Sequence, residues 1–145
     1  MNSNLVMNTS QCPMCEELQM KEHILKKWDN FATIFNRYPY SIGDIMVIPL
    51  QHIDTINNLS KDQRAEFIEA VNISQQLVMK ALETDSSNIG LNCGPQSGAS
   101  IPTHLHMHII PRQTNDMGFY NTICQKIPES KKVCNDMIRK LFSQI

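Results

Sequence analysis

Three of the five histidines in the chain alternate with apolar residues in one short stretch. They are His104, His106 and His108, separated by Leu105 and Met107. Successive side chains of a strand point to opposite faces, so the three imidazoles share one face and the apolar residues share the other. We therefore expect the apolar face to meet the core and the imidazole face to meet a polar cleft or a ligand.

Three interpretations of this histidine run are open. The first is incidental placement, since single histidines are usually polar surface residues or satisfied core residues. The regular alternation of three of the five histidines argues against it. A metal site is the second, because two imidazoles spaced H-x-H on a strand can bind zinc. Phosphoryl chemistry is the third. A neutral imidazole, with an ordinary pKa of about 6.5, is a competent nucleophile near pH 7, and its attack on a phosphate gives a phosphoramidate.

A loop with two glycines precedes the histidine run. Gly94 and Gly98 allow backbone N–H groups to approach an anion closely, and Ser97 and Ser100 add hydroxyl donors. Most loops of this kind are simple turns. Together with the histidines, however, this loop favours the phosphoryl interpretation.

A C-x-x-C pair, Cys12 and Cys15, stands near the N-terminus. The chain has five cysteines and shows no secretion signal, which argues against a disulfide framework. The spacing indicates zinc binding, and redox chemistry is the lesser alternative because no thioredoxin-like context surrounds it. Two ordinary thiols are the third possibility.

The bulk composition fits one intracellular domain. The chain has 145 residues, 41% of them hydrophobic, which is enough for a core. Its net charge of −1 argues against bulk binding of nucleic acid. Residues 1–7 lack the features of a signal peptide, and no apolar run approaches the ~20 residues of a membrane span. We therefore expect a cytoplasmic protein that does not bind membranes.

Sequence periodicity predicts five strands and two helices. The strands are expected at 24–25, 31–35, 44–48, 89–93 and 104–110. A capping box at Ser60–Gln63 opens a long helix that is expected to end near Thr84 or Asp85. A second amphipathic helix is indicated after Pro128 by the apolar positions Val133, Met137, Ile138, Leu141 and Phe142.

These elements favour an α+β domain with a mostly antiparallel five-stranded sheet, one long helix and one C-terminal helix, because strands and helices do not alternate strictly. We expect a single domain over residues 1–145. In it, residues 1–10 are loose, residues 11–112 form the core and residues 113–145 form a C-terminal extension.

The segment His104–Arg112 resembles the signature of the histidine triad (HIT) superfamily, in which three alternating histidines precede two apolar residues and often Pro-Arg. Residues 35–52 and 90–94 are similar to further parts of that family. The tail at 118–121 and 127–129 resembles the branch of diadenosine tetraphosphate phosphorylases and dinucleoside polyphosphate hydrolases.

The resemblance implies a HIT-like fold and release of a nucleoside monophosphate, usually AMP, from a phosphoanhydride or phosphoramidate. His106 would be the nucleophile, His108 would contact the α-phosphate, and His104 would orient the cluster. Asn36 would bind the ribose, and Asn92 and Ser100 would lie near the scissile phosphate. With the glycine loop included, the candidate substrate-binding residues are Asn36, Asn92, Ser97, Gly98, Ser100 and His108. The implied substrate is a purine nucleotide or dinucleoside polyphosphate, the implied assembly is a homodimer, and no catalytic metal is expected.

Other functions stay open beside this one. The chain is alternatively a diadenosine tetraphosphate phosphorylase or adenylyltransferase, a slow nucleotide-binding protein, or a metallohydrolase that uses His106 and His108 as ligands. Family members with an N-terminal C-x-x-C bind structural zinc, and the ligand set that they imply here is Cys12, Cys15, His52 and His104. Asp44 departs from the family, which often has histidine there, and we expect it to hydrogen-bond an imidazole.

Overall fold

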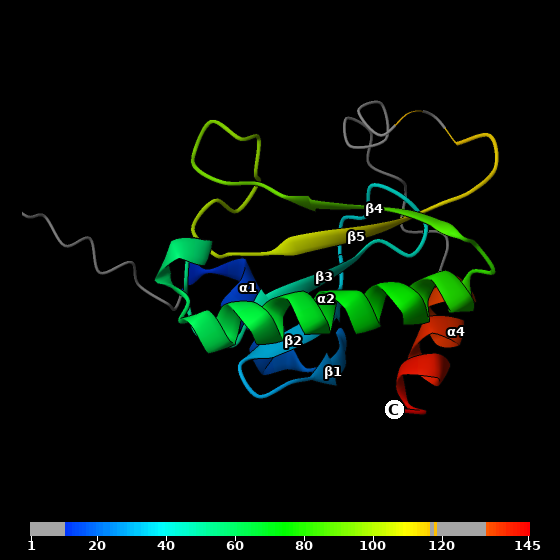
Figure 1. Ribbon diagram of the computed structural model, residues 1–145, viewed down its shortest axis with the longest axis horizontal. Helices are drawn as coiled ribbons and strands as arrows, with labels where there is room; N and C mark the ends of the chain where they lie inside the picture. Colours follow the sequence, from blue (N-terminus) through cyan, green and yellow to red (C-terminus); the bar gives the residue numbers. More distant parts are fainter. Residues whose placement is uncertain (1–10, 117, 119–132) are drawn as a thin grey trace, which may run out of the picture.

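The computed structural model describes residues 11–116, 118 and 133–145 and shows an α+β fold (Figure 1). The helices are α1 (Pro13–Met20), α2 (Lys61–Ala81) and α4 (Val133–Phe142), with a short 3₁₀ helix η2 (Ile56–Asn58). The strands are β1 (Ile24–Lys27), β2 (Phe31–Phe35), β3 (Ile45–Pro49), β4 (Ser86–Leu91) and β5 (Met107–Arg112). They form the five-stranded antiparallel sheet that the sequence predicted, and its strand order is β1-β2-β3-β5-β4.

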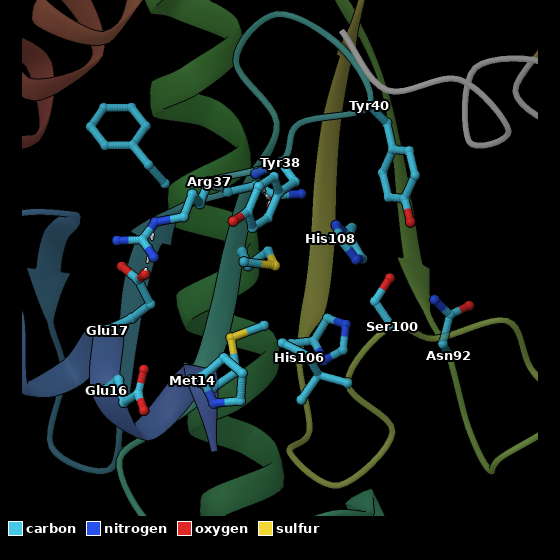
Figure 2. A pocket seen from close by; sticks show the side chains of 15 residues that line it. Met14, Glu16, Glu17, Arg37, Tyr38, Tyr40, Asn92, Ser100, His106 and His108 are labelled. Atoms are coloured by element: carbon cyan, nitrogen blue, oxygen red, sulfur yellow. Dashed lines mark hydrogen bonds and ion pairs between the residues drawn. The ribbon is translucent and has the colours of Figure 1, made fainter. Parts of the chain in front are cut away.

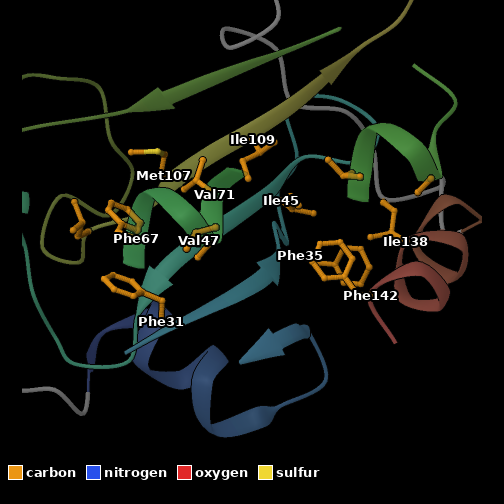
Figure 3. Close-up of a cluster of buried hydrophobic side chains, with 14 of the residues drawn as sticks. Phe31, Phe35, Ile45, Val47, Phe67, Val71, Met107, Ile109, Ile138 and Phe142 are labelled. Carbon is orange, nitrogen blue, oxygen red and sulfur yellow. The ribbon is translucent and has the colours of Figure 1, made fainter. Parts of the chain in front are cut away.

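The main hydrophobic core lies between the sheet and the helices α2 and α4 (Figures 1 and 3). Phe67 and Val71 of α2 and Ile138 and Phe142 of α4 are buried in it. The apolar side chains of the histidine run, including Leu105, Met107 and Ile109, also belong to this core. The predicted apolar face of that run is therefore confirmed.

A second, smaller cluster covers the opposite face of the sheet. Met14 of α1 packs there with side chains of β2 and β3, among them Ile34 and Met46. Met46 is the partner of His108 across the β3–β5 pair, so this is the face that carries the imidazoles. The helix α1 was not predicted, and it supplies this layer.

The long helix α2 begins as the sequence predicted. The Ser60 hydroxyl accepts the Gln63 N–H at 3.1 Å, and the Ser60 N–H donates to the Gln63 side chain at 2.9 Å. The helix ends at Ala81, so the predicted end near Thr84 or Asp85 is wrong. Glu83 has a φ of +50°, which a continuing α-helix does not allow.

The histidine run lies only partly in a strand. The strand predicted at 104–110 is displaced, because β5 begins at Met107. Ahead of it, the Leu105 N–H donates to the Ile53 carbonyl at 2.6 Å instead of joining a ladder. At the other end Pro111 does not stop β5, because it lies beyond the last β3–β5 pair, Ile45–Ile109. Its missing N–H therefore breaks no ladder bond on that side.

The β4 strand also starts earlier than predicted, at Ser86 rather than Ile89, and its polar beginning hid it from the hydrophobic pattern. Residues 1–10, predicted to be loose, and most of the tail at 118–129 lie outside the described residues. Among the residues that are described, no helix has the length and apolar character needed to cross a membrane.

Candidate functional site

A cleft of about 430 Å³ opens on the α1 face of the sheet (Figure 2). Its walls come from α1, from the loop between β2 and β3, from the β4–β5 connection and from the histidine run. The volume lies within the range of about 300–1,000 Å³ that is usual for small-molecule sites. The lining residues used below are Met14, Glu17, Asn36, Arg37, Tyr38, Tyr40, Asn92, Ser100, His106 and His108.

Five of the candidate residues from the sequence meet in this cleft. They are Asn36, Asn92, Ser100, His106 and His108. The other three do not line it. The Ser97 hydroxyl closes its own turn by donating to the Gly94 carbonyl at 2.7 Å, and Gly98 lies in the same exposed loop. His104 points away, toward the cysteines.

His106 is a buried imidazole with a defined orientation. Its Nδ1 lies 2.8 Å from the His104 carbonyl oxygen, which can only accept, so Nδ1 carries the proton and Nε2 keeps its lone pair. Burial lowers the pKa of His106 below its ordinary range, and the neighbouring His108 acts in the same direction. Both effects keep the ring neutral, which is the form that can act as a nucleophile.

His108 lies beside His106, with ring centroids 5.1 Å apart. Its Nδ1 is 3.3 Å from Oδ1 of the buried Asp44, so the expected bond between Asp44 and an imidazole is present. The Tyr40 ring packs against His108 in a T-shaped arrangement, with centroids 5.5 Å apart. The ring of His108 therefore contacts His106, Asp44 and Tyr40.

Sequence reasoning missed the wall of the cleft opposite the histidines. Met14 and Glu17 come from the unpredicted helix α1, while Arg37 and Tyr38 come from a loop without periodicity. The Glu17 carboxylate accepts from Arg37 Nε at 3.2 Å and also contacts His23 Nδ1. The C-x-x-C motif is the one sequence signal near this wall, because Met14 lies between its two cysteines.

A group of four side chains next to the cleft could hold a metal ion. The Sγ atoms of Cys12 and Cys15 and the ring nitrogens of His52 and His104 all lie within 4.8 Å of one another. The distances from Sγ to Nδ1 are 3.4 Å for Cys12–His104, 3.4 Å for Cys15–His52 and 3.6 Å for Cys15–His104. Tetrahedral zinc, with bonds of about 2.3 Å to sulfur and about 2.0–2.1 Å to nitrogen, separates such atoms by about 3.5 Å. These residues therefore fit zinc.

His104 has the orientation that a ligand needs. Its Nε2 donates to the Pro49 carbonyl at 3.0 Å, which leaves the lone pair on Nδ1, the atom that faces the two sulfurs. Burial lowers the pKa of His104, which favours the neutral ring. Burial, together with the neighbouring Cys12, raises the pKa of the Cys15 thiol to about 11.

Two solved structures share this fold. A hypothetical histidine triad nucleotide-binding protein from Sulfolobus tokodaii strain 7 is 25% identical with a TM-score of 0.75, covering 92% of this chain and 93% of its own. A zinc-bound histidine triad family protein from Mycobacterium smegmatis is 20% identical with a TM-score of 0.71, covering 94% and 96% of the two chains.

Curated relatives are longer than this chain. A protein named AP-4-A phosphorylase from Mycobacterium tuberculosis is 30% identical over 90 residues, which are 62% of this chain and 46% of the relative. The chain spans about half the length of the curated relatives that it matches. The family model for the HIT domain matches residues 17–115, which include the histidine run and all five strands of the sheet. The chain therefore belongs to the HIT domain family.

Proposed function

We propose that this protein cleaves a nucleoside monophosphate from a phosphoanhydride or phosphoramidate through a covalent His106–nucleotidyl intermediate. The geometry of His106 carries the proposal. Its Nδ1–H is engaged by the His104 carbonyl, it lines the cleft, and Nε2 is the nitrogen left for attack on phosphorus. His108 lies beside it as a candidate phosphate contact.

The reaction has two steps. In the first, the Nε2 lone pair attacks the α-phosphorus, an N–P bond forms, and the bond from phosphorus to the leaving group breaks with its electron pair. The leaving group keeps that electron pair and, where it is an amine, takes up a proton from solvent. In the second step a water molecule attacks the same phosphorus and loses a proton to solvent, the N–P bond breaks with its electron pair returning to Nε2, and the nucleoside monophosphate is released. Ser100 and Asn92, which line the cleft, are placed near the phosphoryl oxygens in this proposal.

The test compares His106→Ala with wild type on an adenosine phosphoramidate and on diadenosine tetraphosphate. We expect turnover to fall by about 10³-fold or more, because the bond-forming atom is removed. Wild-type protein quenched in alkali during turnover should carry labelled nucleotide on His106, and acid should release it.

His23→Ala is the matched control, because His23 contacts Glu17 behind the α1 wall and does not line the cleft. It should retain nearly full turnover. If His106→Ala keeps the wild-type rate on every substrate that wild type cleaves, the proposed function is wrong. Tight binding of AMP by wild type without turnover on any substrate would instead indicate a nucleotide-binding protein.

Inorganic phosphate is a second candidate acceptor, because the relative from Mycobacterium tuberculosis is named a phosphorylase. Attack by phosphate on the His106–nucleotidyl group would release a nucleoside diphosphate instead of a monophosphate. The same substrates are therefore assayed with and without phosphate, and the products are identified by chromatography.

We also propose that Cys12, Cys15, His52 and His104 hold a structural zinc ion. The near-tetrahedral spacing of the donor atoms supports it, as does the zinc-bound relative from Mycobacterium smegmatis. The ion would tie the N-terminal segment to the entry of the histidine run. Among the described residues, no metal-binding group includes His106 or His108, so the metallohydrolase hypothesis has no geometric support there.

We also propose a cytoplasmic location, a single domain and a homodimer. A reduced zinc-thiolate group suits the cytoplasm, where thiols are kept reduced. We propose a single domain with residues 11–112 as its core and residues 113–145 as its C-terminal extension. A homodimer through the outer edge of β4 is supported by the edge position of that strand and by the exposed Ile89 on it. Light scattering of the purified protein tests the dimer.

A further inference from the structure

Asp44 is the most buried carboxylate near the cleft, with 2% of its surface exposed. It stands at the entry of β3, directly after Gly43, whose φ of +78° lies in the left-handed region that favours glycine. A Cβ on Gly43 would also collide with the Leu82 side chain. The turn therefore fixes the position of the Asp44 carboxylate next to the cleft.

The two carboxylate oxygens of Asp44 contact different residues of the site. Oδ2 accepts from Asn36 Nδ2 at 2.7 Å and from the Tyr40 backbone N–H at 3.0 Å. Oδ1 lies 3.3 Å from His108 Nδ1. One buried carboxylate therefore contacts both the candidate ribose-binding amide and the candidate phosphate-binding imidazole.

These contacts fix the chemistry that each partner offers. Asn36 Oδ1 accepts the Tyr38 N–H at 3.0 Å while Nδ2 faces the carboxylate, so the amide cannot be reversed. One N–H and one lone pair of Asn36 remain for a ligand. Because a carboxylate only accepts, His108 must carry a proton on Nδ1, which leaves Nε2 as its second nitrogen.

We propose that Asp44 is a positioning residue that sets the tautomer of His108 and holds Asn36 and His108 in one fixed relation. The assignment of ribose to Asn36 and phosphate to His108 rests on the proposed function. The carboxylate also allows His108 to be doubly protonated against a phosphate, because both N–H groups then have acceptors. A nucleotide is thus aligned by its sugar and its phosphate together.

The substitution Asp44→Asn separates the contact with Asn36 from the contact with His108. The amide oxygen can keep both bonds that Oδ2 now accepts, so its NH₂ group must face His108 Nδ1. That nitrogen then has to accept, and the proton moves to Nε2. Long-range ¹⁵N–¹H spectra at pH 8 should show Nδ1–H for His108 in wild type and Nε2–H in Asp44→Asn. Asp29→Asn, a change at an exposed turn position, should leave the wild-type tautomer.

The two contacts of Asp44 also predict different effects on turnover and on nucleotide binding. For Asp44→Asn we expect kcat to fall by about 10- to 100-fold and KM to change by less than about threefold, because His108 can no longer be doubly protonated without facing the NH₂ group. The preference for AMP over 2′-deoxy-AMP, measured by calorimetry, should persist in Asp44→Asn and disappear in Asn36→Ala. Asp44→Ala should lose both the preference and the tautomer.

Several outcomes overturn the inference. One is an Nε2–H tautomer of His108 in wild type, which decides the matter even if the variants do not fold. Others are a wild-type tautomer, or a kcat within twofold of wild type, in Asp44→Asn. The proposed function fails separately, through an active His106→Ala protein, since the tautomer and AMP binding are read without turnover.

Discussion

His104 and His106 are two residues apart and are held in opposite ways. His104 donates from Nε2 to the Pro49 carbonyl and turns Nδ1 toward the two cysteines. His106 donates from Nδ1 to the His104 carbonyl and keeps Nε2 for the cleft. The carbonyl that accepts from each ring decides which nitrogen is left, and so separates a candidate metal ligand from a candidate nucleophile.

The regions around the two rings differ as well. The donor atoms of the four candidate metal ligands all lie within 4.8 Å of one another. The cleft around His106 is lined by side chains from several segments that are separate in the sequence. A closed donor set suits a structural ion, whereas a cleft suits a ligand that enters and leaves. Substitutions in the two regions should therefore have different effects on metal content and on nucleotide binding.

The largest effect is expected from Cys15→Ser. Losing a ligand should remove the metal and lower the free energy of unfolding by about 4–5 kcal/mol or more, since loss of a bound metal is among the most destabilising changes. Metal analysis and thermal unfolding measure both effects. The exposed thiol Cys93 supplies the matched control, and Cys93→Ser should keep one metal per chain and the wild-type stability. Equal metal content in Cys15→Ser and wild type would contradict the metal site.

Met14→Ala should have an intermediate effect. Met14 lies between the two cysteines in the sequence. Its side chain is 6% exposed, belongs to the smaller hydrophobic cluster and lines the cleft. We expect a loss of about 2–3 kcal/mol in stability and weaker AMP binding by about 10-fold, with the metal retained. Chemical denaturation and calorimetry check this. Unchanged AMP affinity would show that α1 is not part of the nucleotide site.

The smallest effect is expected from Glu17→Gln. The change removes the charge that holds Arg37 Nε at 3.2 Å, but the Arg37 side chain is 41% exposed and the pair is screened by water. We expect weaker AMP binding by about two- to fivefold, equivalent to about 0.5–1 kcal/mol, and a smaller difference at high salt. Titrations at two salt concentrations test it, and a larger effect on the metal than on AMP would contradict it.

The sequence predicted the sheet, the long helix and the face of the histidine run, because each depends on a local period or cap. Ser60 and Gln63 are an example, since their side chains cap α2 from within four residues. The boundaries of β5 were not predictable in this way. They depend on Ile53 and Pro49, which are distant in the sequence and supply the carbonyls to which Leu105 and His104 donate.

The α1 wall was missed for a related reason. Of its eight residues, the buried ones are Met14 and Glu17, and a glutamate in a buried position hides the amphipathic pattern. The burial of Glu17 depends on Arg37 and His23, and no spacing rule links these residues. The candidate histidines were found from their alternation with apolar residues as well as from the family resemblance, whereas Asn36 was found from the resemblance alone. Of the glycine loop, Ser100 lines the cleft, whereas Ser97 and Gly98 do not.

The position of Pro13 and Met14 has a consequence for how this site can evolve. Both residues line the cleft, and in the sequence both lie between the two cysteines of the candidate metal-binding group. An insertion or deletion here would alter the spacing of the cysteines, whereas a substitution would leave it intact. Along this wall, substitutions can therefore change the substrate preference, whereas insertions and deletions in the chain would disturb the cysteine spacing.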